Sequence, residues 1–316
     1  VLYAKPHNPA VGKNWAQHNK AFVNFINNEC YGSVLEIGGG NLHIANMLAS
    51  SEKVNQYSVI DSNIFKSNDQ TGKIKFNEEI FDLSSIEDKK YDFVIHSHVL
   101  EHFYQPLKSL KEIRRILKPN GKMIFSAPMI DNMLKEGFTN ALNFEHTYYI
   151  NEDVVKFMLE KTGFSLDKSL FYSTPSLKKW CLFTSCSIGE VKQIDMQWNN
   201  KPAKDFRQFL KSNKDVVASI NKRLEEYEDS EKFVFGGHIF TQFLLNFGLK
   251  DDFICVLDND KDKHNEFLYG TSLIVRSPKI LSKYKKPVVV LKAGLYNEEI
   301  KQDILKNIND ETIFLE

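Results

Sequence analysis

A glycine-rich turn near the start of the chain most constrains the fold. The sequence V-L-E-I-G-G-G-N at residues 34–41 reads as a short buried strand that stops in a turn and runs into a helix. Gly38 and Gly40 let the backbone turn tightly and come close to a ligand, and the helix start offers unpaired N–H groups. Such turns lie at the carboxyl end of the first parallel strand, where open α/β sheets bind their ligands. The stretch therefore predicts an α/β fold with a ligand crevice.

The residues around this turn favour some ligands over others. The dinucleotide fingerprint G-x-G-x-x-G fails because His43 stands where the last glycine belongs, and no Gly-Lys-Ser/Thr ends the turn as in a phosphate-binding loop. Instead, Glu36 precedes the first glycine by two residues. A carboxylate there suits a cationic ligand group better than a phosphate. An ordinary strand–turn–helix without a ligand is the alternative.

Three more apolar segments follow, and the first two run into acids. A strand at 57–60 ends at Asp61, whose carboxylate can accept hydrogen bonds from both hydroxyls of a ribose or can simply cap a turn. A strand-like segment at 73–81 is followed by Asp82, and Y-D-F-V-I-H-S-H forms a fourth strand at 91–98. Beyond it we expect a helix that begins at Pro106, a turn at 119–121 and a fifth strand at 122–126.

The pattern E-x-G-x-G and the run from Y-D-F-V-I-H-S-H-V-L-E-H-F to M-I-F-S-A-P, residues 91–128, together resemble class I S-adenosylmethionine (SAM) methyltransferases. The resemblance implies a Rossmann-like sheet, SAM as cofactor and S-adenosylhomocysteine as product. It also implies contacts to the methionine end, the ribose, the adenine and the methyl donor from Glu36, Gly38, Gly39, Gly40, Asp61, Asp82, Leu83 and His98. Leu42 departs from the third glycine that the family often has.

After the fifth strand comes N-F-E-H-T-Y-Y, residues 143–149. This segment resembles the Glu-His segment of sugar methyltransferases, including C-methyltransferases of nucleotide-linked keto-deoxysugars. The resemblance implies catalysis by His146 as a base, with Glu145 fixing its tautomer, and a substrate contact from Tyr148. The alternative is a structural Glu–His pair. Asn143 replaces a tyrosine of those C-methyltransferases, and their cysteine-rich zinc segment is not in this sequence.

A second α/β pattern occupies the carboxyl-terminal part of the chain. F-V-F-G-G-H at 233–238 is followed by a helix to Phe247 and by a strand that ends at Asp258. The run from 233 to about 304 resembles the C-terminal domain of the same C-methyltransferases, which helps to hold the nucleotide sugar. Gly236, Gly237 and Asp258 are the implied substrate contacts; alternatively the domain only packs on the first.

Length and composition set the domain plan and the partners. The 316 residues suffice for two domains, and we expect a lid helix within 1–30, a SAM domain at 31–200, a linking helix at 201–230 and an α/β domain at 231–316. The 41 basic residues balance the 41 acidic ones, which argues against a nucleic-acid partner. No apolar run approaches the ~20 residues of a membrane span, so no membrane partner is expected.

Metal binding is not predicted. The four cysteines contain no C-x-x-C pair, which indicates a reduced, cytoplasmic setting without a zinc knuckle. His96, His98 and His102 lie close in sequence, but the first two share one strand face and the third lies past a turn.

These features predict SAM-dependent methyl transfer to a small polar acceptor, either a sugar or a nucleotide-linked sugar. Methylation at carbon and at oxygen both stay open. A protein that keeps the SAM fold as a non-catalytic binding or scaffold module is the alternative from another class. An NAD(P)-linked oxidoreductase would need a full glycine fingerprint, which neither glycine turn has. The sequence does not indicate an oligomeric state.

Overall fold

The computed structural model describes residues 13–26, 29–77, 83–138, 142, 145–174, 178–196, 201–250 and 252–316. The chain divides into two compact units. The first comprises residues 1–132 and 144–198, and the second comprises 133–143 and 199–316. Each unit is built on its own β-sheet.

The first unit contains a seven-stranded sheet in the order β3-β2-β1-β4-β5-β7-β6. Its strands are β1 (Gly32–Ile37), β2 (Val54–Ile60), β3 (Ile74–Asn77), β4 (Tyr91–Ser97), β5 (Leu117–Pro128), β6 (Phe164–Tyr172) and β7 (Cys181–Ile188). β1 to β5 pair in parallel, whereas β7 runs antiparallel to both β5 and β6. The predicted Rossmann-like α/β fold is therefore confirmed.

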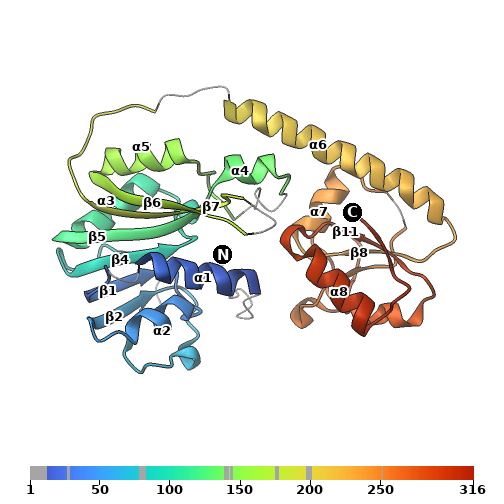
Figure 1. The fold of residues 1–316 in the computed structure, drawn as a ribbon, viewed down its shortest axis with the longest axis horizontal. Helices are drawn as coiled ribbons and strands as arrows, with labels where there is room; N and C mark the ends of the chain where they lie inside the picture. Colours follow the sequence, from blue (N-terminus) through green and yellow to red (C-terminus); the bar gives the residue numbers. More distant parts are fainter. Residues whose placement is uncertain are drawn as a thin grey trace. The chain divides into compact units, whose positions relative to one another are not determined.

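Helices cover both faces of this sheet (Figure 1). They are α1 (Lys13–Ile26), α2 (His43–Ala49), α3 (Pro106–Ile116) and α5 (Glu152–Thr162), with short 3-10 turns η1 (Lys66–Asn68) and η2 (Leu100–His102). The short helix α4 (Ile130–Lys135) begins in the first unit and ends in the second. α3 and α5 contact each other over one face, and α1 and α2 contact each other over the opposite face. The layer between the sheet and helices α3 and α5 contains the fully buried side chains of Leu35, Val94 and Phe125. At about 1.5–3 kcal/mol for each buried large side chain, this layer is the main stabilising term of the unit.

The second unit contains a five-stranded, fully parallel sheet in the order β10-β9-β8-β11-β12. Its strands are β8 (Lys232–Phe235), β9 (Cys255–Leu257), β10 (Val275–Arg276), β11 (Val288–Leu291) and β12 (Ile313–Leu315). Its helices are α6 (Lys201–Leu224), α7 (Ile239–Asn246) and α8 (Asn297–Asn307), with 3-10 turns η4 (Glu225–Tyr227), η5 (Lys261–Lys263), η6 (Pro278–Lys283) and η7 (Gly294–Tyr296). The central strands read as continuous apolar runs because both faces are buried.

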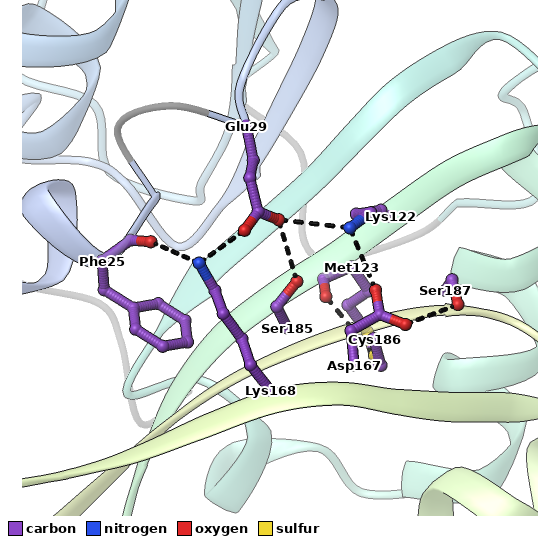
Figure 2. Close-up of polar contacts among 9 residues, drawn as sticks. All are labelled: Phe25, Glu29, Lys122, Met123, Asp167, Lys168, Ser185, Cys186 and Ser187. Atoms are coloured by element: carbon purple, nitrogen blue, oxygen red, sulfur yellow. Dashed lines mark hydrogen bonds and ion pairs between the residues drawn. The ribbon is translucent and has the colours of Figure 1, made fainter.

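A charged cluster fastens the segment after α1 to the antiparallel edge of the first sheet (Figure 2). The carboxylate of Glu29 lies 2.5 Å from Lys168 Nζ and 3.2 Å from Lys122 Nζ. Lys122 continues to Asp167 at 3.1 Å, and Asp167 accepts a hydrogen bond from Ser187. Lys168 also donates to the carbonyl of Phe25 at the end of α1. The cluster joins α1 to β5, β6 and β7.

One local expectation was wrong. Residues 119–121 do not end a turn before a new strand; they lie within β5, where the register with β4 shifts between Tyr91 and Phe93. Leu117 pairs with Tyr91 and Lys122 with Phe93, so residues 118–121 of β5 lie opposite the single residue Asp92. Cys181 and Cys186 lie on β7, between β5 and β6, and both are fully buried.

Candidate active site

The glycine turn lies directly after β1, as predicted. Gly38 has φ +75° and donates its N–H to the carbonyl of Ile60, so the turn is bonded to the end of β2. A Cβ on Gly38 would lie 2.4 Å from Val99 Cγ2, and one on Gly40 would lie 2.2 Å from the carbonyl oxygen of Asn63. No side chain fits at either position, and the Gly38 backbone is exposed to a ligand.

Asp61 lies at the end of β2, beside this turn. Its Oδ2 accepts the N–H of Gly40 at 2.9 Å, and its Oδ1 accepts the N–H of Asn63 at 2.9 Å. Each carboxylate oxygen has two lone pairs, so both retain capacity for a further hydrogen bond. The side chain is half-buried and held in one orientation. Vicinal hydroxyls of a ribose fit this acceptor pair.

Glu36 is enclosed beneath the turn rather than open to the crevice. Only 3% of the residue is exposed, and Tyr57 donates its hydroxyl to Oε2 at 2.7 Å. Burial raises the pKa of Glu36 to about 7, the charge of Asp61 adds to this, and the Tyr57 hydrogen bond opposes it. A Cβ on Gly39 would lie 2.5 Å from the Glu36 carboxyl carbon. A direct contact of Glu36 and Gly39 with the methionine end stays a prediction.

Leu42, which stands where the family often has a third glycine, has a left-handed backbone. It has φ +59°, lies in the left-handed region and is fully buried. An L-residue pays roughly 1–2 kcal/mol for this conformation, which burial of the leucine side chain offsets.

The predicted adenine contacts are only partly visible. Leu83 is buried in the core beside Ile86 and Leu100. Asp82 lies outside the described residues, so its contact with the adenine amino group stays a prediction.

His98 follows β4 with φ +54° and turns its ring toward α1 and β7. It stacks on Trp180 at a centroid distance of 5.4 Å and lies edge-on to Trp15 at 4.9 Å. Its Nδ1 is 3.4 Å from Glu101 Oε1, and its Nε2 is 3.5 Å from Cys181 Sγ. Burial lowers the pKa of His98 to about 3. Its predicted contact with the methyl donor remains untested.

The Glu-His segment lies against η2. His102 Nδ1 donates to the carbonyl of Glu145 at 3.0 Å, and the His102 and His146 rings meet edge-on at 5.1 Å. Tyr148 donates its hydroxyl to the carbonyl of Leu100. Burial lowers the pKa of His146 to about 4, while the charge of Glu101 opposes the shift.

Glu101 is the residue that sequence reasoning missed. It is 1% exposed, and its carboxylate groups with His102 and His146, with ligand atoms all within 4.8 Å of one another. Burial raises its pKa. Glutamate is seldom buried, so the residue type did not predict a buried site residue here. The sequence hint was its position in V-L-E-H, shortly after the end of a strand.

The second unit repeats the geometry of the first turn. Gly236 donates to the carbonyl of Leu257 at 2.7 Å, as Gly38 does to Ile60. Gly237 donates to Asp258 Oδ2 at 2.7 Å, and Asp260 donates its N–H to Oδ1 at 2.8 Å. Lys263 Nζ lies 3.3 Å from Asp258. The predicted residues are thus brought together, although their substrate contact stays a prediction.

Comparison with known proteins decides the class of the first unit. The model of a family described as a methyltransferase domain matches residues 13–169. The protein contains a class I SAM-dependent methyltransferase domain. The predictions of an enzyme of this class and of SAM as its cofactor are confirmed. All the residues predicted to contact SAM lie within the matched range, and their contacts with it stay predictions.

The relatives of the methyltransferase domain are distant. A protein of Dictyostelium discoideum named probable polyketide synthase 9/36 is 25% identical over 136 residues, which are 42% of this chain and 5% of that protein. The chain thus spans a small fraction of that relative's length. A SAM-dependent methyltransferase from Mesorhizobium loti is 12% identical with a TM-score of 0.44, covering 53% of this chain and 95% of the other. A Pyrococcus horikoshii protein is 16% identical with a TM-score of 0.45, covering 56% and 92%.

Proposed function

We propose that the protein transfers the methyl group of SAM to a small polar acceptor, namely a sugar or nucleotide-linked sugar. The observation that carries the proposal is the pairing of the SAM-type turn with a neutral, half-buried histidine, His146, in the segment after the fifth strand. When bound, SAM supplies an electrophilic methyl on a sulfonium. The chain's own task is to align the acceptor and exclude water, which is worth several kcal/mol.

His146 is the proposed general base. With its pKa lowered to about 4 by burial, the ring is neutral at pH 7 and can accept a proton from a hydroxyl or from a carbon beside a ketone. Glu145 is the proposed group that fixes its tautomer, and Tyr148 a proposed acceptor contact. The buried carboxylate whose charge acts on His146 is that of Glu101.

The second turn supports a nucleotide-linked acceptor. Gly236 and Gly237 present a backbone turn beside Asp258 that matches the cofactor turn, and Lys263 adds a positive charge beside it. We propose that this turn contacts the nucleotide part of the acceptor. The four cysteines are buried and free, which supports the proposed cytoplasmic setting. None of the described helices is long and apolar enough to cross a membrane.

The test incubates the full chain with SAM and a panel of nucleotide sugars. A mass gain of one methyl on one acceptor supports the proposal, and NMR of the product distinguishes carbon from oxygen methylation. SAM binding without transfer to any acceptor would instead favour the non-catalytic module.

Variants then assign the roles. His146→Ala should keep SAM affinity and slow transfer by roughly 10²–10⁴-fold; full activity would remove it as the base. Glu145→Gln should slow transfer as well. An unchanged rate in Glu145→Gln would show that Glu145 does not fix the tautomer of His146. Glu101 would then be the candidate for that role.

A further inference from the structure

Two histidines and a cysteine from distant segments meet inside the first unit. His18 comes from α1, His98 follows β4, and Cys181 opens β7. Cys181 Sγ lies 3.6 Å from His18 Nε2 and 3.5 Å from His98 Nε2, and the three ligand atoms all lie within 4.8 Å of one another. His18 and Cys181 are fully buried, and the His98 side chain is 14% exposed.

The hydrogen-bond partners set the protonation of this cluster. His18 Nδ1 lies 3.2 Å from the side-chain oxygen of Asn19, and His98 Nδ1 lies 3.4 Å from Glu101 Oε1. Both partners accept, so each Nδ1 carries the hydrogen and each Nε2 presents a lone pair to the sulfur. A thiol has one hydrogen and can serve only one of the two lone pairs.

We propose that His18, His98 and Cys181 bind a Zn²⁺-class divalent ion, with Glu101 orienting His98. Zn–N bonds of about 2.0–2.1 Å and Zn–S bonds of about 2.3 Å at tetrahedral angles place nitrogen and sulfur about 3.5 Å apart, which matches the two observed separations. Two imidazoles and a thiolate select zinc-like ions over Mg²⁺ and Ca²⁺, which take oxygen ligands. On binding, the thiol proton passes to solvent and a sulfur–metal bond forms.

The Glu101 carboxylate lies beside the proposed ligand His98. A metal-ligating histidine commonly donates its second N–H to a carboxylate, and the Glu101 carboxylate, 3.4 Å from His98 Nδ1, is placed for that role. The other oxygen of Glu101 has no hydrogen-bond partner among the described residues. The ion's two positive charges balance the thiolate and the Glu101 carboxylate. Three protein ligands leave a fourth position for water or a small ligand, and the site ties α1 to the ends of β4 and β7.

The test uses the purified full chain after treatment with a chelator. Titration with Co²⁺ should produce tetrahedral cobalt absorption and a thiolate-to-cobalt charge-transfer band that saturates at one ion per chain. Zn²⁺ should then displace the band. Co²⁺ should also quench tryptophan fluorescence, because Trp15 and Trp180 contact His98.

Matched cysteine variants locate the site. Cys181→Ser should lose the charge-transfer band. Cys186→Ser should keep it, because Cys186 is equally buried in β7 but hydrogen-bonds to the carbonyl of Met123. Glu101→Gln should weaken the metal affinity by about 10–100-fold. Circular dichroism verifies that each variant is folded.

The wild-type spectrum alone is decisive even if Cys181→Ser does not fold. Absence of a charge-transfer band in the wild-type chain overturns the proposal, and so does a band that survives Cys181→Ser. The readout needs neither SAM nor an acceptor, so it is independent of methyl transfer.

Discussion

The backbone N–H of Gly40 donates a 2.9 Å hydrogen bond to the carboxylate of Asp61, which lies 21 residues further along the chain. The same bond joins Gly237 to Asp258 at 2.7 Å, across the same sequence separation. In both units the bond fixes a glycine turn after the first strand of the unit to the tip of the next. The protein therefore carries two similar strand-end arrangements, each at the ends of two adjacent parallel strands of its own sheet.

This relationship makes Asp61 and Asp258 a matched pair for testing cofactor binding. Asp61→Ala should weaken SAM binding by at least about tenfold, because it removes a charged hydrogen-bond acceptor worth roughly 1.5–3 kcal/mol. Asp258→Ala removes an equivalent carboxylate in the second unit and should leave SAM affinity unchanged. Isothermal titration calorimetry measures both. Equal SAM affinity in wild type and Asp61→Ala would contradict the ribose role.

The buried carboxyl of Glu36 predicts a pH dependence of stability. Its folded-state pKa, raised to about 7 by burial, exceeds the ordinary value of 4.5. The folded state therefore binds the proton more tightly, and the stabilisation is complete below about pH 4.5 and lost as the pH rises to about 7. This component amounts to roughly 3 kcal/mol.

Glu36→Gln should remove that component while keeping an acceptor for Tyr57. Urea unfolding at a series of pH values measures the difference between variant and wild type. The difference should move in favour of the variant between pH 5 and 7, as expected for roughly 2.5 units of pKa shift. A pH-independent difference would show that Glu36 titrates normally.

The charged cluster around Glu29 predicts a salt-sensitive contribution. Burial alone would raise the pKa of Glu29, but hydrogen bonds from Lys168 and Lys122 outweigh it and hold the pKa below the usual value. Glu29→Gln should lower the free energy of unfolding by about 1 kcal/mol, a modest value because the pair is partly exposed. High salt should reduce the stability difference between variant and wild type. The wild type should itself lose the stabilisation by Glu29 as the pH falls through the pKa of the Glu29 carboxyl. Glu160→Gln, which breaks a more exposed pair with Lys192, is the control.

The left-handed backbone of Lys89 predicts that glycine is tolerated better there than at the neighbouring Lys90. Lys89 has φ +52° and an exposed side chain, whereas its exposed neighbour Lys90 has no positive φ. Both replacements by glycine carry the same unfolded-state entropy cost. Lys89→Gly should therefore be more stable than Lys90→Gly by about 1–2 kcal/mol. Thermal unfolding of the two variants checks the order, and the reverse order would mean that the Lys89 conformation is unstrained.

Local pattern was enough to predict the strand and helix series. The apolar strands, the turn glycines and the strand-end acids each follow from neighbours in sequence, so β1, β2, β4 and α3 lie where expected. The Rossmann-like class of the sheet followed from resemblance. The inclusion of residues 119–121 in β5 did not, because proline and glycine are typical of turns.

Much of the site could not be predicted because it depends on long-range contacts. Cys181 meets His18 across 163 residues and His98 across 83, and no local spacing encodes either contact. The burial of Glu36 and Glu101 is also a property of the packed sheet rather than of the residues. A metal search by sequence compared His96, His98 and His102, whereas the structure brings only His98 of these three into the cluster with His18 and Cys181.

The all-parallel order of the second sheet has a consequence for synthesis on the ribosome. β8 needs both β9 and β11 as neighbours, yet β11 is made more than fifty residues after β8. Parallel pairing of this kind forms slowly because a long intervening segment must first be ordered. The apolar β8 strand thus emerges with one edge open and is the segment that a chaperone would have to shield until β11 has been translated.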